Sequence, residues 1–365
     1  MANYFLIAGE ASGDIHAAEL MKQIRQREPD AVFAGMGGDR MEAAGCHLHR
    51  HIRFMAFMGF AAVMKHWRDV RDNFRIAREA LLAERPDVLI LIDYPSFNLR
   101  MAEFCKRHLT NTKIVYYIPP KVWAWKKRRV HTIARLCDEV LGIFPFEPDF
   151  YAKYGYSCRY VGNPTAEEIG NGKWKKENGK CIAILPGSRS NEIRHCLPKM
   201  LEAARRMNGY PLVVCAAPNI DQALYTPYLQ EGETLTRDTY GTLATAAAAV
   251  VNSGTATLET ALLGCPQVAV YHLACSRLIG LIRWAQPMLF SIPYFTLVNI
   301  IAGKQVIREC IADTFTVNNV ADELQRLLHD EAYKKEMLAS YNHLLSLLGS
   351  QPASATAAEI ITSKP

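Results

Sequence analysis

Short apolar runs recur along this chain, and each ends in glycine or small polar residues before a helical pattern begins. Residues 88–92 read Val-Leu-Ile-Leu-Ile, and similar runs lie at 4–8, 113–118, 181–185, 246–251 and 267–271. Short continuous apolar runs bounded by turn residues are typical of parallel strands buried on both faces. Strands that alternate with helices predict an α/β protein with doubly wound sheets.

The alternation is interrupted once, by a polar stretch rich in glycine and lysine at residues 167–180. We therefore expect two Rossmann-like doubly wound domains that face a cleft, at residues 1–165 and 180–349. A last short helix is predicted at 353–361. This tail, residues 350–365, could pack on the first domain or on a partner chain, and the sequence does not choose between them.

Composition excludes several classes of protein. The ten cysteines form no CxxC pair, which favours free buried thiols over disulfides or a zinc site. The chain starts with a strand-like run and contains no stretch of about 18 apolar residues, so we expect a cytoplasmic protein. The net charge of +6 permits anionic ligands or lipid surfaces without requiring them.

Two strand–turn–helix junctions are suited to binding phosphate. One carries Ser253, Gly254 and Thr255 after an apolar run, and the other carries Gly187, Ser188 and Arg189. Backbone amides and the positive end of a helix dipole converge at such junctions. Arg189 adds a guanidinium fork for a diphosphate, and Glu259, about one turn into its helix, could reach a ribose hydroxyl pair. Ordinary capped turns are the alternative.

The first half offers a different set of candidates. Asp93 follows the strongest strand signal, so it is expected at the carboxyl edge of the sheet as a general base, or as a cap of the next turn. The loop 9–14 lacks the GxGxxG spacing of an NAD site. Its amides could face the inter-domain cleft, or Ser12 or Asp14 could simply cap the helix that follows.

Residues 54–67 are rich in aromatic residues and methionine, and several arginines follow them. The members expected to meet lipid are Met55, Phe57, Met58, Phe60, Val63, Met64 and Trp67. Such a segment fits a membrane interface or an acyl-chain groove, and it fits a core helix equally well. The basic cluster at 126–129 could meet phosphate or anionic lipid, or be a solvated helix start. Nucleic acid is not expected, because no nucleic-acid motif surrounds the cluster.

Eight motifs together resemble the lipid-A-disaccharide synthase family, glycosyltransferases of the GT-B type, over nearly the whole chain. They lie at residues 9–14, 36–38, 93–98, 122–125, 161–164, 185–189, 253–259 and 299–303. Two positions depart from the family pattern. Ala11 stands where the family usually has proline, and Tyr94 stands where a small residue is common.

The resemblance implies a reaction in lipid A biosynthesis of Gram-negative bacteria. UDP-2,3-diacylglucosamine would donate its sugar to 2,3-diacylglucosamine 1-phosphate, bound by the first domain, giving the tetraacyl disaccharide 1-phosphate and UDP. A β-linkage from an α-linked donor implies inversion with one base, for which Asp93 is the candidate. Rivals from the first loop are Glu10, Asp14 and His16, and Ser12 and Gly13 are further acceptor-side candidates.

The second domain would bind the nucleotide through the two junctions, Glu259 and Asn299, which lies in a predicted strand or loop before Gly303. The sequence has no Asp-x-Asp, so no metal or other cofactor is expected. The resemblance also implies peripheral association with the inner membrane, and a homodimer is possible. Another UDP-sugar glycosyltransferase or epimerase, or a nucleotide-sugar-binding scaffold, would share the same fold.

Overall fold

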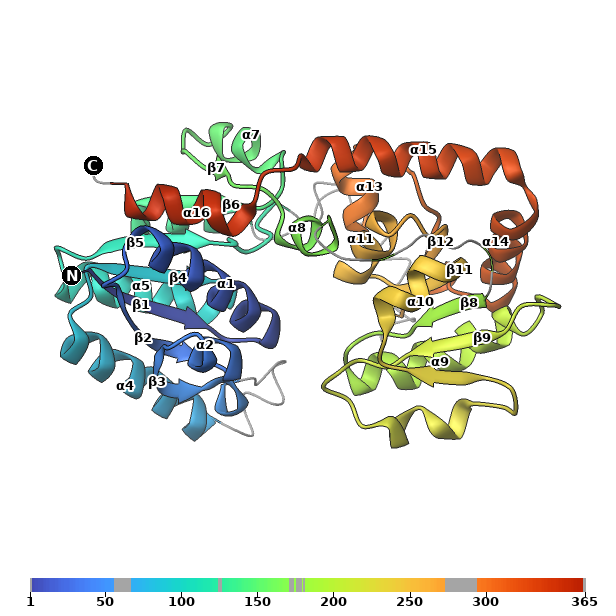
Figure 1. Ribbon diagram of the computed structural model, residues 1–365, viewed down its shortest axis with the longest axis horizontal. Helices are drawn as coiled ribbons and strands as arrows, with labels where there is room; N and C mark the ends of the chain where they lie inside the picture. The colour runs from blue at the N-terminus through green and yellow to red at the C-terminus, as the bar shows by residue number, and fades with distance from the viewer. Residues whose placement is uncertain are drawn as a thin grey trace. The chain divides into compact units, whose positions relative to one another are not determined.

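The computed structural model describes residues 2–55, 67–123, 127–170, 174, 179, 181–272 and 294–363. The chain forms two compact units, one of Met1–Glu167 with Ser350–Pro365 and one of Glu168–Gly349. The change of unit after Glu167 falls in the polar stretch that interrupts the strand–helix pattern. Each unit is an open parallel sheet with helices on both faces, as predicted (Figure 1).

The first unit holds a seven-stranded sheet in the order β3-β2-β1-β4-β5-β6-β7. Its strands are β1 (Asn3–Ala8), β2 (Val32–Gly37), β3 (His47–His51), β4 (Val88–Ile92), β5 (Lys113–Tyr117), β6 (Glu139–Gly142) and β7 (Arg159–Tyr160). Its helices are α1 (Ala11–Arg27), α2 (Asp39–Ala43), α4 (Trp67–Glu84), α5 (Pro95–His108), α6 (Arg129–Leu136), α7 (Glu147–Ala152) and α16 (Ala353–Thr362), and α8 (Pro164–Gly170) leads into the second unit. The strand order reverses between β1 and β4, which is therefore the switch point of this sheet.

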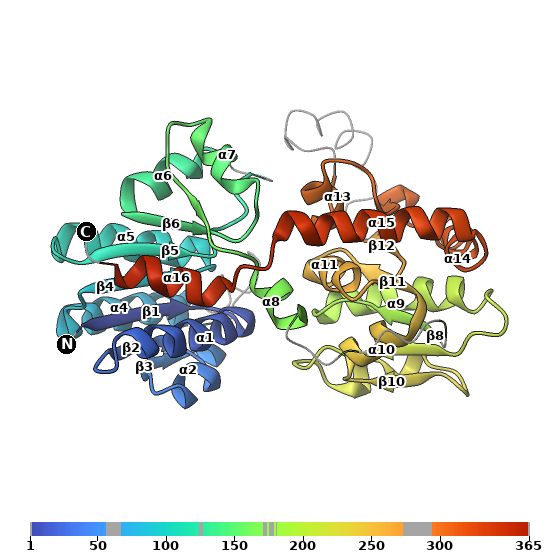
Figure 2. The same ribbon diagram turned by 45° about the horizontal axis from the view of Figure 1, so that its top comes forward.

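Alternate residues of each strand enter different cores. Phe5 and Ile7 of β1 pack with α4, α5 and α6, whereas Leu6 and Ala8 pack with α1, α2 and α16. Burial on both faces explains why these strands read as continuous apolar runs. The final helix α16 packs on α1, within the first unit (Figure 2).

The second unit holds a six-stranded parallel sheet in the order β10-β9-β8-β11-β12-β13, with its switch point between β8 and β11. Its strands are β8 (Cys181–Leu185), β9 (Leu212–Cys215), β10 (Thr234–Thr236), β11 (Ala246–Asn252), β12 (Gln267–Tyr271) and β13 (Glu309–Ile311). Its helices are α9 (Ser190–Ala204), α10 (Thr239–Thr245), α11 (Thr255–Leu262), α13 (Leu297–Ala302), α14 (Val317–His329) and α15 (Glu331–Leu348).

Two further observations bear on the sequence predictions. The nine cysteines within the described ranges are all buried free thiols. Among the helices that the structure describes, none is long and apolar enough to cross a membrane.

Candidate active site

The predicted motifs gather at the two switch points. In the first unit, the loops after β1 and β4 carry Glu10 and Asp93, and these two strands are hydrogen-bonded neighbours. In the second unit, β8 and β11 are neighbours, and they lead into the loops of Arg189 and Ser253. Ligands of open parallel sheets bind outside the carboxyl ends of the strands at this point of reversal.

The backbone is strained around Asp93. Asp93 and Tyr94 both have φ of +44°, and Ile118, which follows the neighbouring strand β5, has φ of +59°. Residues other than glycine rarely adopt this left-handed region, and each costs on the order of 1–3 kcal/mol. Strain of this kind persists where the surrounding structure enforces it, and it concentrates at functional sites.

Hydrogen bonds enforce the conformation at Asp93. Its N–H donates to the carbonyl of Ile118 at 3.2 Å. Its carbonyl oxygen accepts from Asn98 Nδ2 at 2.7 Å and from the Tyr116 hydroxyl at 2.8 Å. The main chain of Asp93 is thus fixed from three sides, while its side chain remains only partly buried.

The surroundings tune the acidity of the Asp93 carboxyl group. Burial raises its pKa, and the charge of Lys121 and a hydrogen bond from the Tyr94 backbone oppose that rise. A carboxylate with a raised pKa is a stronger base than a free aspartate, which is what proton abstraction from a hydroxyl requires.

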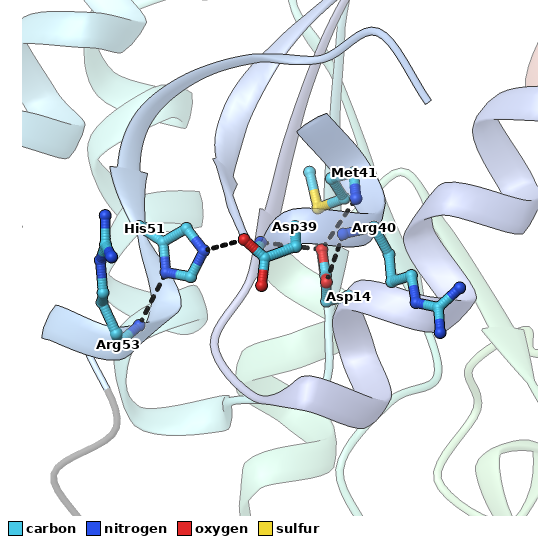
Figure 3. Close-up of polar contacts among 7 residues, drawn as sticks. Asp14, Asp39, Arg40, Met41, His51 and Arg53 are labelled. Atoms are coloured by element: carbon cyan, nitrogen blue, oxygen red, sulfur yellow. Dashed lines mark hydrogen bonds and ion pairs between the residues drawn. The ribbon is translucent and has the colours of Figure 1, made fainter. Parts of the chain in front are cut away.

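Asp14 has a different role from the one predicted for a rival base. Its carboxylate accepts from the backbone N–H groups of Gly38 at 2.8 Å, Arg40 at 3.0 Å and Met41 at 3.0 Å (Figure 3). The side chain is 4% exposed and binds the start of α2. Its oxygens already accept from these amides, so Asp14 has a structural role here, and its role as a base or acceptor contact stays a prediction.

The other first-loop candidates stay predictions. Glu10 is partly buried just before α1. Burial is the main cause that raises the pKa of Tyr94, and the charge of Glu10 raises it further. Burial lowers the pKa of His16 to about 4, so its imidazole is neutral at pH 7. Ser12 is exposed in the first turn of α1, and Gly13 packs against Ala8.

Tyr94 joins the two loops of this switch point. Its ring lies directly over Gly9, where any Cβ would collide with it. Its hydroxyl donates to the carbonyl of Met55 at 2.9 Å. The unusual tyrosine at this position therefore requires glycine at position 9 and anchors the chain at Met55.

Among the predicted lipid-contact residues, the structure describes the side chain of Met55. Met55 is fully buried in the core formed with α4 and α5, so its side chain is not on the surface, and its contact with a membrane or an acyl chain stays a prediction. Phe57, Met58, Phe60, Val63 and Met64, and the side chain of Trp67, lie outside the described residues.

Glu147 is a buried carboxyl group that the sequence analysis did not single out. It follows β6 at the same carboxyl edge as Asp93, it is 1% exposed, and burial raises its pKa to about 7. Trp123 of the 122–125 motif donates to it at 3.2 Å. The sequence does contain a signal for this residue, because Glu147 directly follows the apolar run 140–146.

In the second unit, the loop after β8 is closely packed. Gly187 has φ of +115°, and a Cβ there would lie 2.5 Å from Glu192 Oε2 and 2.7 Å from Asn252 Nδ2. Glycine is thus needed for both conformation and space. Arg189 pairs with Glu192 at 2.9 Å, yet its side chain stays 58% exposed, which leaves donors directed to solvent.

Two helices that begin at this edge, α9 and α11, lack side-chain caps. Neither Arg189 before α9 nor Gly254 before α11 makes a side-chain capping hydrogen bond. The first N–H groups of a helix have no intrahelical partner, so these two starts are suited to an anion.

Glu259 lies in α11, one turn after Thr255. Burial, and then the charge of Glu168, raise the pKa of Glu259 to about 7, while a hydrogen bond with Thr255 opposes the rise. A partly buried acceptor beside the helix start is consistent with the predicted ribose contact, which stays a prediction.

Asn299 does not lie in a strand or loop, and its amide is engaged by residues 306–309. It is fully buried in α13. Its Oδ1 accepts from the N–H groups of Val306 and Ile307, and its Nδ2 donates to the carbonyl of Ile307 and to Glu309. This side chain anchors residues 306–309, and the nucleotide contact of Asn299 stays a prediction.

One group of side chains within the described ranges could hold a cation. Donor atoms of His47, His49 and Glu84 lie within 4.8 Å of one another, and His49 and Glu84 already pair at 2.7 Å. His47 begins β3, so the group lies towards the amino ends of the strands, away from Asp93. It offers no argument for metal at the switch point.

Comparison with known proteins identifies the family. The family model described as lipid-A-disaccharide synthetase matches residues 4–361. The lipid-A-disaccharide synthase of Myxococcus xanthus is 36% identical, over 98% of this chain and 96% of its own length. That of Trichlorobacter lovleyi is 35% identical, over 98% of this chain and 96% of its own.

Solved structures agree on the fold at low sequence identity. The glycotransferase of kitacinnamycin matches 99% of this chain and 98% of its own with a TM-score of 0.65 and 14% identity. The Staphylococcus aureus MnaA–UDP co-structure matches 100% and 99% with a TM-score of 0.66 and 13% identity. At such identities these likenesses show the fold alone. The full-length family match and the relatives above 30% identity show that the chain belongs to the lipid-A-disaccharide synthase family.

Proposed function

We propose that this chain joins UDP-2,3-diacylglucosamine to 2,3-diacylglucosamine 1-phosphate, releasing UDP and the tetraacyl disaccharide 1-phosphate. Membership of the family makes it a UDP-sugar-dependent glycosyltransferase of lipid A biosynthesis. The observation that carries the assignment of the base is the strained, hydrogen-bonded Asp93 at the switch point of the first unit.

In the proposed mechanism, Asp93 takes the proton of the acceptor 6-hydroxyl as that oxygen attacks the anomeric carbon of the donor. The bond from that carbon to UDP breaks in the same displacement, which inverts the configuration. The negative charge that develops on UDP would be stabilised by Arg189 and the uncapped starts of α9 and α11. We propose that no metal is needed for this step.

The test is turnover in detergent with EDTA present, for the wild type and Asp93→Asn. We expect disaccharide formation to persist in EDTA and to fall about 10²–10⁴-fold in the variant, because asparagine cannot accept the proton. UDP binding should be unchanged. A fully active variant would move the base to Glu10 or His16, and no wild-type product would remove the assignment.

A surface of the first unit supports peripheral association with an anionic membrane. A groove of about 620 Å³ lies between α4 and α5. Its lining combines the cations Arg71, Arg75, Arg78 and Arg100 with the acidic Glu79 and the apolar Val70, Phe74, Leu82 and Phe104. We name it the arginine groove.

The arginines of this groove rest on its aromatic rings. The guanidinium of Arg78 lies 5.4 Å from the ring centre of Phe104, and that of Arg100 lies 5.2 Å from that of Phe74. Arginine held on an apolar surface meets both parts of a lipid headgroup region, the phosphate and the start of the acyl chains. We propose that the arginine groove contacts anionic phospholipid of the inner membrane.

A further inference from the structure

Two histidines and a glutamate lie together at the β3 edge of the first unit's sheet. His47 and His49 belong to β3, and their rings meet edge-on with centres 4.8 Å apart. Glu84 is the last residue of α4, and its Oε1 lies 2.7 Å from Nε2 of His49. Donor atoms of all three residues lie within 4.8 Å of one another. Two imidazoles and a carboxylate are thus brought together from a strand and a helix.

A shift in strand pairing explains why His49 faces α4. Residues 35–36 of β2 are consecutive, yet they pair with Leu48 and Arg50. His49 is therefore the extra residue of β3, and a bulge of this kind re-aims a side chain. Its ring stacks on Phe5, a core residue on the α4 side of the sheet, with ring centres 6.0 Å apart. The imidazole is thus oriented by packing, and it remains 22% exposed.

The end of α4 fixes the position of Glu84. Arg85 leaves the helical region with φ of +43°, and its N–H still donates to the carbonyl of Leu81 at 3.0 Å. Pro86 follows, and proline disfavours helical conformation at the residue before it. Helix α4 also lies against β3. The carboxylate of Glu84 is therefore held beside the two histidines, with its side chain 33% exposed.

These donors are suited to a transition-metal ion. Imidazole and carboxylate both bind Zn²⁺ and related divalent ions, whereas Mg²⁺ and Ca²⁺ prefer oxygen ligands. Ligand bonds of about 2.0–2.2 Å place the donor atoms of a tetrahedral site about 3.3–3.5 Å apart. The three donor atoms need movements on the order of 1–1.5 Å to reach that spacing. Rotation of the exposed His47 side chain can supply most of this movement.

We propose that His47, His49 and Glu84 form a binding site for a divalent transition-metal ion, with Zn²⁺ as the representative. The ion takes the place of the direct contact between His49 and Glu84, and it joins the edge strand β3 to the end of α4. The site lies towards the amino ends of the strands, whereas Asp93 follows the carboxyl end of β4. Its role is therefore structural and independent of the reaction proposed for this chain.

The first experiment is calorimetric titration with ZnCl₂ of the untagged full-length protein after treatment with EDTA. We expect the wild type to bind Zn²⁺ saturably. His47→Gln and His49→Gln should each bind it at least about tenfold more weakly, because losing even an outer-shell partner of a ligand costs about that much. The matched control is His51→Gln on the same strand. It should stay within about twofold of the wild type, because His51 pairs with Asp39 of α2, at 3.1 Å.

Hydrogen exchange shows whether the ion joins the two elements. Zn²⁺ should slow the exchange of the β3 amides in the wild type, because an ion that binds the native arrangement suppresses its local opening. The same addition should have no such effect in Glu84→Gln, which retains both histidines and loses the carboxylate of α4. Excess Mg²⁺ should leave bound Zn²⁺ in place, because imidazole is a poor ligand for Mg²⁺.

Several results would overturn the site. One is a wild type that does not bind Zn²⁺, and another is equal loss of affinity in His49→Gln and His51→Gln, which would indicate binding to histidines in general. His47 is exposed, so His47→Gln decides the question if His49→Gln does not fold, and an unchanged affinity there would contradict the proposal. Displacement of Zn²⁺ by Mg²⁺ would refute the transition-metal assignment, and unchanged β3 exchange would refute the link to α4.

Discussion

Asp14 and Asp93 both lie beside the switch point of the first unit, but different backbone groups reach them. Asp14 lies in the first turn of α1, where the amides at the start of α2 point at its carboxylate. Asp93 is held instead through its own main chain, so its carboxyl group remains partly accessible. The two residues are of the same type. The backbone N–H groups that reach the carboxylate of Asp14 make that aspartate the structural one.

This difference predicts the stability of two variants. Asp14→Ala should lower the free energy of unfolding by about 2 kcal/mol or more, because buried N–H groups lose their acceptor at about 1–3 kcal/mol each. Urea unfolding measures it. Asp39→Ala is the matched control, since the side chain of Asp39 is 92% exposed and pairs with His51 at 3.1 Å (Figure 3).

The control should change stability by no more than about 1 kcal/mol, as expected for an exposed ion pair. Equal losses in the two variants would show that the carboxylate of Asp14 does not stabilise α2. Turnover measured under stabilising conditions should survive in Asp14→Ala, which would separate this residue from Asp93.

At the scale of elements, residues 294–303 have a strand-like composition, but capping residues at both ends favour a helix. Residues 294–303 contain β-branched and aromatic residues, yet Leu297–Ala302 form α13. Thr296 accepts from the N–H of Asn299 at the start, and Gly303 ends the helix with φ of +66°. A short helix of this kind depends on its caps and on packing against α11 and α15, which periodicity alone does not report.

The pairing of α4 with α5 yields the prediction for the membrane. Replacing Arg78 and Arg100 with glutamine should weaken binding to phosphatidylglycerol vesicles about tenfold or more, because each cation near an anionic surface contributes about 1 kcal/mol. Vesicle sedimentation at low and high salt measures it. The matched control is Lys22→Gln with Arg40→Gln, on the helices α1 and α2 that cover the opposite face of the sheet.

The control pair should bind vesicles as the wild type does, and phosphatidylcholine vesicles should bind all three proteins weakly. Equal weakening in both pairs would mean that net charge alone governs binding. Unchanged binding in the Arg78 and Arg100 variant would remove the arginine groove as the contact.

At the scale of the whole molecule, the chain returns to its first unit after completing the second. The helix α16 contributes Ala357, Ala358 and Ile361 to the core beside α1. Gly162 closely approaches the backbone at Gln351, and Ser354 bonds Glu167, so the returning segment is held where the first unit ends. Residues at opposite ends of the sequence thus form one core.

Ile361→Ala tests this return. It should lower the free energy of unfolding of the first unit by about 2–5 kcal/mol, the usual cost of truncating a buried isoleucine. Hydrogen exchange of β1 amides reports on that unit. Glu359→Ala, whose side chain is 74% exposed, is the control and should stay within about 1 kcal/mol. Unchanged exchange in Ile361→Ala would show that the first unit is stable without α16.

The sequence determined the α/β class, the two sheets and the loops at their carboxyl ends, because strand runs and glycine junctions are local features. It also determined the family, since the motifs stand in the sequence itself. Only the tertiary structure decided what Asp14, Met55 and Asn299 do, because burial and hydrogen-bond partners come from distant segments. The same physics revealed Glu147: its partner Trp123, which follows β5, meets it only when β5 and β6 lie side by side.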